Sequence, residues 1–127
     1  MKHEIILKKL LNYINDIFEY TDGYSYIQFS ENKMCIGACV FSLSQMGELC
    51  KNLSEDFKTE HSELPWHELY GLRNRIVHDY EGVNLKFVWQ IIREDLPLLT
   101  PQLEALLADE QQLQDSKFPL SSQTEDD

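Results

Sequence analysis

Apolar residues recur at steps of three and four along most of this chain, and such spacing predicts amphipathic helices. The first predicted helix covers residues 3–20, and Gly23, in the turn that follows it, is a good C-cap candidate. Residues 24–29 are predicted to add one short helical turn. No strand pattern is found, so we expect no β-sheet.

The second predicted helix is apolar on more than one face, which is typical of a helix that touches several neighbours. It begins with Ser30 or Asn32 as its N-cap and extends to about Leu53. Gly37 and Gly47 lie inside it, although an interior glycine costs about 1 kcal/mol relative to alanine. Close packing against another helix is a plausible reason for each glycine.

A polar segment, residues 54–63, is interpreted as the end of that helix and a loop. Pro65 suits the first turn of a third helix, because its missing N–H does no harm there. This third helix is predicted to extend from about residue 66 to residue 77.

The last predicted helix begins after Asn84 as its N-cap and continues to about Ala108, and Pro97 is expected to kink it or split it. Residues 109–127 are rich in Gln, Ser and Asp and are predicted to form a flexible acidic tail. We therefore expect residues 1–108 to form one domain, an all-α, up-and-down bundle of four or five helices.

The composition is that of an ordinary globular domain. The chain has 127 residues, of which 43% are hydrophobic and 26% are charged. It has no apolar run of about 18 residues, the length of a membrane span, and its start lacks the pattern of a signal peptide. We therefore expect a cytoplasmic protein.

The cysteines are Cys35, Cys39 and Cys50, an odd number without an export signal, so a disulfide framework is not expected. Cys35 and Cys39 are one helical turn apart and could share a metal ion, but no Cys or His pair matches them at a useful spacing. Buried, reduced thiols are the expectation, with no metal site and no cofactor.

The formal net charge of the chain is -11 at pH 7, which argues against broad electrostatic binding of nucleic acid. Any contact with RNA or a nucleotide has to come from a local basic pocket. An acidic surface is easier to reconcile with a basic protein partner.

The segment 72–80, LRNRIVHDY, concentrates polar groups that are expensive to bury unpaired. On an ideal helix, Arg73 and His78 are separated by a rotation of about 140° and do not share a face. One solution is that the helix ends near Val77 and His78 turns back toward Arg73. The other is that two copies of the segment meet across a twofold axis and line one cleft.

Arg73 and His78 together suit metal-free cleavage of RNA. A guanidinium offers a planar donor fork to phosphate, and an imidazole titrates near neutral pH. His78 would deprotonate a ribose 2′-hydroxyl or protonate the leaving 5′-oxygen, Arg73 would hold the phosphate, and Asn74 would orient either group. The alternative is structural, in which these residues cap helix carbonyls and pair with acids such as Glu48 or Glu81.

Glu48 allows two interpretations that the sequence leaves open. It is either a solvated residue at the edge of its helix or a buried carboxylate that pairs with an arginine of segment 72–80. Arg75 is expected to be a surface or salt-bridge residue. From the residues alone, Tyr80 is a packed aromatic whose hydroxyl is hydrogen-bonded.

Residues 73–80 resemble the R-x4-H-x-Y motif of the HEPN superfamily, in particular its HepT-like toxin branch. The resemblance covers roughly residues 5–107, in order and at the right spacings. Outside the motif it rests on Met46-Gly47-Glu48 (usually Ile-Gly-Glu in that branch), Leu64-Pro65-Trp66, Gly71-Leu72-Arg73-Asn74, Tyr80-Glu81-Gly82-Val83, Val88-Trp89-Gln90-Ile91 and Asp95-Leu96-Pro97.

The resemblance implies a homodimeric ribonuclease toxin of a toxin–antitoxin pair. By motif position, Arg73 and His78 are the implied catalytic residues and Asn74 is an implied site residue. The usual partner in that branch is a minimal nucleotidyltransferase of the MntA type, which transfers AMP from ATP to the motif tyrosine, here Tyr80. The added anionic group would repel RNA beside the cleft.

Functions of another class remain open. The protein could be a non-catalytic subunit whose dimer cleft holds a nucleotide or presents substrate to a nucleotidyltransferase. A purely structural helical adaptor is a third possibility. An active ribonuclease toxin predicts that His78→Ala removes growth inhibition, whereas a binding subunit predicts only weaker binding.

Overall fold

The computed structural model describes residues 2–78 and 82–117. Its helices and strands, in chain order, are α1 (Lys2–Tyr20), α2 (Tyr26–Glu31), α3 (Lys33–Cys50), α4 (Glu55–Glu60), α5 (Trp66–Tyr70), α6 (Leu72–Ile76), β1 (Val77–His78), β2 (Gly82–Val83), α7 (Leu85–Gln90), the π-helical turn η1 (Ile91–Asp95) and α8 (Leu96–Lys117).

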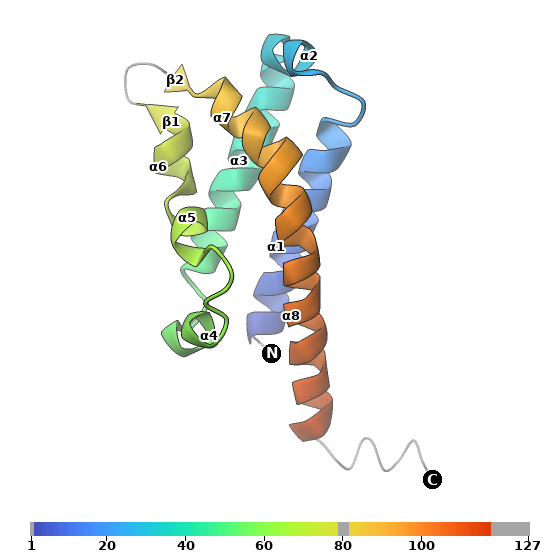
Figure 1. Ribbon diagram of the computed structural model, residues 1–127, viewed down its shortest axis with the longest axis vertical. Coiled ribbons are helices and arrows are strands. Elements are labelled where there is room, and N and C mark those ends of the chain that lie inside the picture. Colours follow the sequence, from blue (N-terminus) through green and yellow to red (C-terminus); the bar gives the residue numbers. More distant parts are fainter. Residues whose placement is uncertain (1, 79–81, 118–127) are drawn as a thin grey trace.

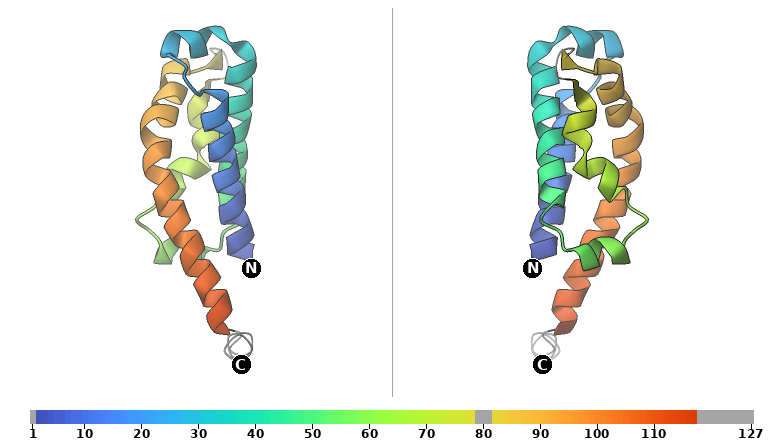
Figure 2. Two further views of the ribbon diagram at one scale, coloured as in Figure 1. Left: turned by 90° about the vertical axis from the view of Figure 1, so that its right-hand side faces the viewer. Right: turned by 90° about the vertical axis from the view of Figure 1, so that its left-hand side faces the viewer.

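These elements form an up-and-down bundle (Figure 1). α1 rises from the N-terminus, α3 descends beside it, α5 and α6 rise again, and α7, η1 and α8 descend as one long rod. α2 closes the upper end and α4 the lower end, while α8 extends below the rest of the bundle (Figures 1 and 2). The predicted all-α bundle is therefore confirmed.

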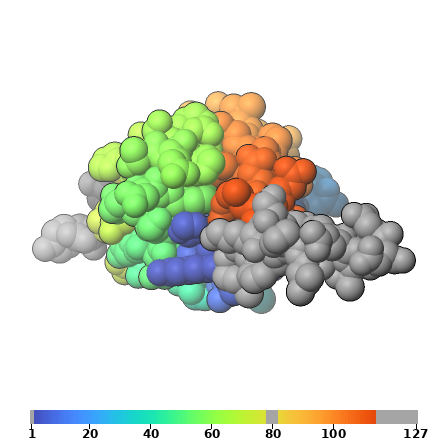
Figure 3. Space-filling model, turned by 90° about the horizontal axis from the view of Figure 1, so that it is seen from below, coloured from blue at the N-terminus to red at the C-terminus, as the bar shows by residue number. Residues whose placement is uncertain are grey.

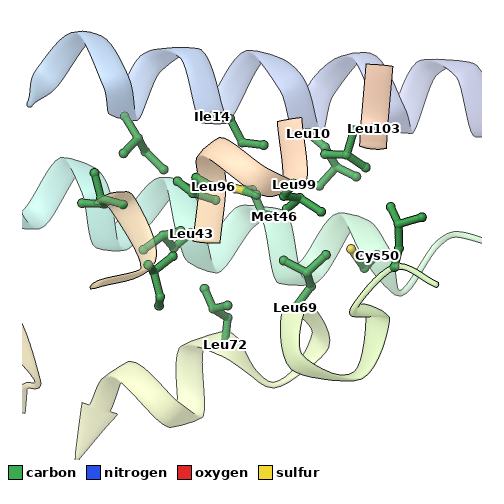
Figure 4. Close-up of a cluster of buried hydrophobic side chains, with 14 of the residues drawn as sticks. Leu10, Ile14, Leu43, Met46, Cys50, Leu69, Leu72, Leu96, Leu99 and Leu103 are labelled. Carbon is green, nitrogen blue, oxygen red and sulfur yellow. The ribbon is translucent and has the colours of Figure 1, made fainter. Parts of the chain in front are cut away.

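The core is organised around α3, as its apolar pattern predicts. Met46 of α3 is fully buried and lies among side chains from the other three arms of the bundle (Figure 4). Those labelled neighbours are Leu10 and Ile14 of α1, Leu69 of α5, Leu72 of α6, and Leu96, Leu99 and Leu103 of α8.

Caps decide where α2 and α3 begin. Ser25 caps α2 in a capping box with Gln28, so the short helix starts two residues later than predicted. Asn32 is the predicted cap of α3, and its Oδ1 accepts a hydrogen bond from the backbone N of Cys35 at 3.0 Å. The alternative cap, Ser30, lies inside α2 instead.

The loop predicted over residues 54–63 is wrong, because α4 forms there. The Ser54 hydroxyl accepts a hydrogen bond from the Phe57 backbone N at 3.1 Å, and Phe57 is buried against the His3 ring, with 4.2 Å between ring centroids. Seen from below, the start of α1 lies between the α4–α5 segment and α8 (Figure 3). His3 bridges them, since its Nδ1 is 3.4 Å from Oε1 of Glu110.

The last helix differs from its prediction in two ways. Asn84 caps it as expected, but a π-helical turn over Ile91–Asp95 comes directly before α8, of which Pro97 is the second residue. α8 then continues to Lys117, so the helix end predicted near Ala108 is wrong. Of residues 109–113, all but Glu110 are exposed, so this extension of α8 adds little to the core. The remainder of the predicted tail, residues 118–127, lies outside the described residues.

The cysteines are buried and reduced. Burial raises the pKa of both Cys39 and Cys50 from 9.0 to about 12, with Cys35 adding to the shift at Cys39. Because the folded state keeps these thiols protonated, their contribution to stability is complete below pH 9 and is lost as the pH rises toward 12.

We expect the native protein at pH 8 to expose at most one thiol per chain, Cys35, to a disulfide reagent such as DTNB. A rise of three pKa units lowers the thiolate fraction of Cys39 and Cys50 about a thousandfold, and burial blocks access as well. Absorbance of the released thiol, compared with that of the guanidinium-unfolded chain, measures this difference. Prompt reaction of all three native thiols would contradict the prediction.

Candidate functional site

Gly47 of α3 allows α5, which leads into the segment with Arg73, to pack closely against α3. A Cβ atom built on Gly47 would lie 2.7 Å from the backbone O of Leu69, so glycine lets α5 approach α3 this closely. A Cβ on Gly37 would meet nothing within 4 Å. The prediction of close packing is therefore confirmed for Gly47 and wrong for Gly37.

The third predicted helix is not continuous. It breaks at Gly71 into α5 and α6, and α6 ends at Ile76 because Val77 is extended, with φ -104° and ψ 121°. Glycine has a low helix propensity, and the β-branched pair Ile76-Val77 favours extended backbone. Leu72 and Ile76 are buried and fix α6 on the bundle.

A short hairpin carries His78, which corrects the expectation that the chain has no strands. Val77 pairs with Val83 and His78 with Gly82, and Gly82 has a φ of +78°. The backbone N of Asn84 also donates a hydrogen bond to the O of Ile76 at 2.8 Å. The backbone of His78 therefore lies on a strand just after the end of α6, so the helix ends where the first of the two expected geometries places its end. That His78 turns back toward Arg73 stays a prediction.

Tyr80, the predicted modification site, lies outside the described residues, together with Asp79 and Glu81. Its modification by AMP stays a prediction. The second expected geometry, a cleft between two copies of the chain, is likewise untested by a single chain.

Arg73 and Asn74 are exposed and border one hollow of about 530 Å³ on the surface of α3, α5 and α6. Among the described side chains, no carboxylate lies within ion-pair distance of the Arg73 guanidinium. As far as the described residues go, the guanidinium donors are available to an anion. The other residues that line this hollow are Phe41, Ser44, Gln45, Glu48, Lys51 and Tyr70.

Glu48 follows the first of its two interpretations. Its side chain is 61% exposed, and its Oε2 lies 2.6 Å from Nζ of Lys51. This hydrogen-bonded carboxylate raises the pKa of Lys51. The other interpretation, a buried pair with an arginine, is wrong within the single chain, because the Glu48 side chain points to solvent rather than into the core.

Arg75 faces away from this hollow. Its guanidinium stacks over the Phe87 ring, 4.8 Å from the centroid, and borders a second hollow beside Glu68 and Asp95. It is exposed, as expected of a surface residue. The two arginines of the motif therefore serve different surfaces.

Sequence reasoning missed the surroundings of Tyr70. Nζ of Lys51 lies 5.5 Å and Nζ of Lys58 5.3 Å from the centroid of the Tyr70 ring. The three residues come from the end of α3, from α4 and from α5, so no local pattern joins them. In the sequence, the one hint that Tyr70 belongs to this site is that it lies three residues before Arg73.

The outer surface of α3 beside the hollow is apolar. Phe41 is 59% exposed and borders the hollow, and Met34, two helical turns earlier, is 87% exposed. In the part of the chain that the structure describes, no three His, Cys, Asp or Glu side chains are placed to hold a metal ion, and no helix is long and apolar enough to cross a membrane.

Comparison with known proteins relates this chain to proteins named as ribonucleases. The sequence model of a family described as "Ribonuclease HepT-like" matches residues 10–106. Proteins of Caldanaerobacter subterraneus and Methanocaldococcus jannaschii, both named as candidate RNases, are each 34% identical to this chain, over 82% and 77% of it and 93% and 90% of their own lengths. A protein of Thermococcus cleftensis named "Probable ribonuclease HepT" is 33% identical over 82% of this chain and 94% of its own length. No solved structure matches the chain significantly.

Proposed function

Because the chain belongs to the ribonuclease HepT-like family, it is a ribonuclease, and we propose that it is a cytoplasmic, metal-independent endoribonuclease toxin. The observation that carries this proposal is the position of Arg73. Its exposed guanidinium borders a surface hollow, and the strand with His78 begins two residues after Arg75. A phosphate donor fork and a titrating imidazole are thus carried by adjacent elements.

RNA supplies its own nucleophile, so acid–base chemistry and a cation are sufficient for cleavage. In the proposed reaction, His78 removes the proton of a ribose 2′-hydroxyl, and the 2′-oxygen attacks the adjacent phosphorus. The bond from phosphorus to the 5′-oxygen breaks, and the leaving oxygen takes a proton from water. Arg73 stabilises the negative charge that develops on the phosphate oxygens, and Asn74 orients the phosphate.

The experiment that tests this proposal is cleavage of single-stranded RNA by the purified protein in excess EDTA. We expect products that end in a 2′,3′-cyclic phosphate and a 5′-hydroxyl, which mass spectrometry identifies. Activity that EDTA removes and Mg²⁺ restores would overturn metal independence. RNA that is bound but never cut would favour the alternative, a non-catalytic binding subunit.

We further propose that the protein is a homodimer that pairs the exposed surface of α3 with its copy. Phe41 and Met34 form an exposed apolar surface next to Arg73, and burying such a surface is favourable. A twofold axis there would bring two copies of Arg73 and His78 to one cleft. Glu48, exposed beside the same hollow, would then lie close to the second copy, with its carboxylate held by Lys51.

Phe41→Ala should raise the dimer dissociation constant about tenfold, since truncating a central aromatic of an interface removes more than about 1 kcal/mol. Analytical ultracentrifugation over a dilution series measures this constant. Leu98→Ala is the matched control, because Leu98 of α8 is 71% exposed but lies outside the α3 surface. An equal effect of both changes, or a wild-type monomer, would contradict this interface.

The antitoxin that we propose is an MntA-like nucleotidyltransferase that transfers AMP to Tyr80. In this step the tyrosine oxygen attacks the α-phosphate of ATP, pyrophosphate leaves and the phenolic proton is released. The adenylyl group brings a negative charge and bulk next to His78 in the sequence, which opposes binding of the RNA phosphate.

Tyr80→Phe should leave growth arrest intact while it abolishes rescue by a co-expressed nucleotidyltransferase of this kind. Phenylalanine keeps the ring and removes the oxygen that accepts AMP. Colony counts after induction, with intact-mass measurement of the purified protein, report both effects. Rescue of the Tyr80→Phe variant, with AMP found on another residue, would reassign the modification site.

A further inference from the structure

We propose that Tyr70, with Lys51 and Lys58, is a binding subsite for one unpaired nucleotide of the RNA, next to Arg73. This inference rests on the proposed ribonuclease function and deepens it, because it names single-stranded RNA as the substrate class. Tyr70 and Lys51 line the same hollow as Arg73 and Asn74.

The Tyr70 ring has the properties of a stacking platform. Tyr70 is 47% exposed and borders the hollow. Nucleobases stack on exposed aromatic rings irrespective of their sequence, and only an unpaired base presents a free face. The ring therefore selects a single strand or a loop over a duplex.

The two lysines play different parts. Lys58 is only 11% exposed and is paired with Glu55 at 3.0 Å, so it is fixed beside the ring. Lys51 is 46% exposed. Because a lysine side chain is long and flexible, Lys51 can leave the ring to an incoming base and move to the neighbouring phosphate. The hollow then offers that phosphate a second cation besides Arg73.

Glu48 restrains this subsite. Its carboxylate is bonded to Lys51 and presents a negative charge to any phosphate that approaches. An RNA phosphate that binds Lys51 must therefore break the ion pair between Glu48 and Lys51 or push the Glu48 carboxylate aside. Removal of the charge at position 48 should therefore strengthen RNA binding, which distinguishes a nucleotide subsite from a purely structural cluster of the same residues.

The subsite also reconciles RNA binding with a chain whose net charge is -11. A broad basic surface is not needed where Lys51 and Lys58 flank one aromatic ring, and Lys51 and Arg73 line the hollow beside it. Recognition then depends on a few local contacts, and the salt dependence of binding should be correspondingly shallow.

The test is fluorescence anisotropy with a short, fluorescein-labelled, single-stranded oligonucleotide of 2′-O-methyl RNA, which cannot be cleaved because it lacks the nucleophile. We expect Tyr70→Leu to weaken binding about tenfold and Tyr70→Phe to leave it unchanged. Lys51→Gln should lower the salt slope by about 0.7. Glu48→Gln should tighten binding severalfold.

Two exposed residues provide matched controls. Tyr20 is 42% exposed at the end of α1, and Lys8 is 52% exposed and paired with Glu4 on the same helix. Tyr20→Leu and Lys8→Gln should bind like wild type, and circular dichroism should show every variant folded.

The subsite and the proposed function fail in different ways. If the wild type cleaves RNA but Tyr70→Leu and Lys51→Gln bind and cleave like wild type, the subsite is overturned and the ribonuclease stands. If the wild type binds the probe through Tyr70 but never cleaves RNA, the subsite stands and the proposed reaction fails. A wild type that does not bind the probe overturns the subsite.

Discussion

Replacement of His78 by alanine should reduce RNA cleavage at least about a hundredfold, because a positioned general acid–base group contributes roughly 10²–10⁴-fold to such reactions. Arg73→Ala should cause a loss of similar size by removing the donor fork that stabilises the developing phosphate charge. The two losses should differ in kind. Arg73→Ala should also weaken binding of uncleavable RNA, whereas His78→Ala should leave that binding nearly unchanged.

Initial rates of cleavage and anisotropy with uncleavable RNA measure these effects side by side. The chain supplies controls of the same residue types in Arg75, which stacks on Phe87, and in the exposed His67. Arg75→Ala and His67→Ala should retain nearly full activity. Full activity of His78→Ala would show that His78 takes no part in the reaction. Full toxicity of this variant in growing cells would lead to the same conclusion.

Gly47→Ala should lower the free energy of unfolding by about 1–3 kcal/mol, the usual cost of forcing an extra methyl group into a packed contact. The new Cβ would lie 2.7 Å from the Leu69 carbonyl oxygen, and backbone atoms cannot rotate away as a flexible side chain can. α5 has to move, and Tyr70 and Arg73 move with it. We therefore expect weaker RNA cleavage as well as lower stability.

Gly37→Ala is the control on the same helix. Its Cβ would meet nothing within 4 Å, so the gain in helix propensity, up to about 1 kcal/mol, should appear as added stability. Urea unfolding followed by circular dichroism measures both variants, and cleavage assays show whether the site moves. Equal stability changes of the two variants would show that α5 can adapt to the extra methyl group.

Much of the bundle could be predicted from periodicity, because long amphipathic helices repeat their apolar residues over many turns. The α1 helix has such a repeat, α3 is apolar on several faces over its whole length, and the caps Asn32 and Asn84 mark the starts of α3 and α7. The short α4 could not be predicted in this way. Five of its six residues are polar, and the helix is held by one cap, Ser54, and by the packing of Phe57 against His3, which is distant in the sequence.

The candidate site was predictable only where local sequence determines it. The RNRIVHDY segment identifies Arg73 and His78, yet the break at Gly71 and the hairpin after Ile76 decide where they lie. Glu48 shows that burial cannot be predicted from sequence neighbours alone, because its neighbours are apolar and its side chain is nevertheless exposed. The lysines around Tyr70 come from separate helices and become visible only in three dimensions.

The π-helical turn in the last long helix has a consequence for insertions and deletions. Val88, Ile92 and Leu96 are all buried, although eight residues of regular α-helix would rotate the last away from the first by about 80°. The wider turn absorbs one extra residue and keeps them on one face. The loss of one exposed residue there, such as Arg93, would leave the bundle in register, whereas the same loss in α3 would turn half of its core residues toward solvent.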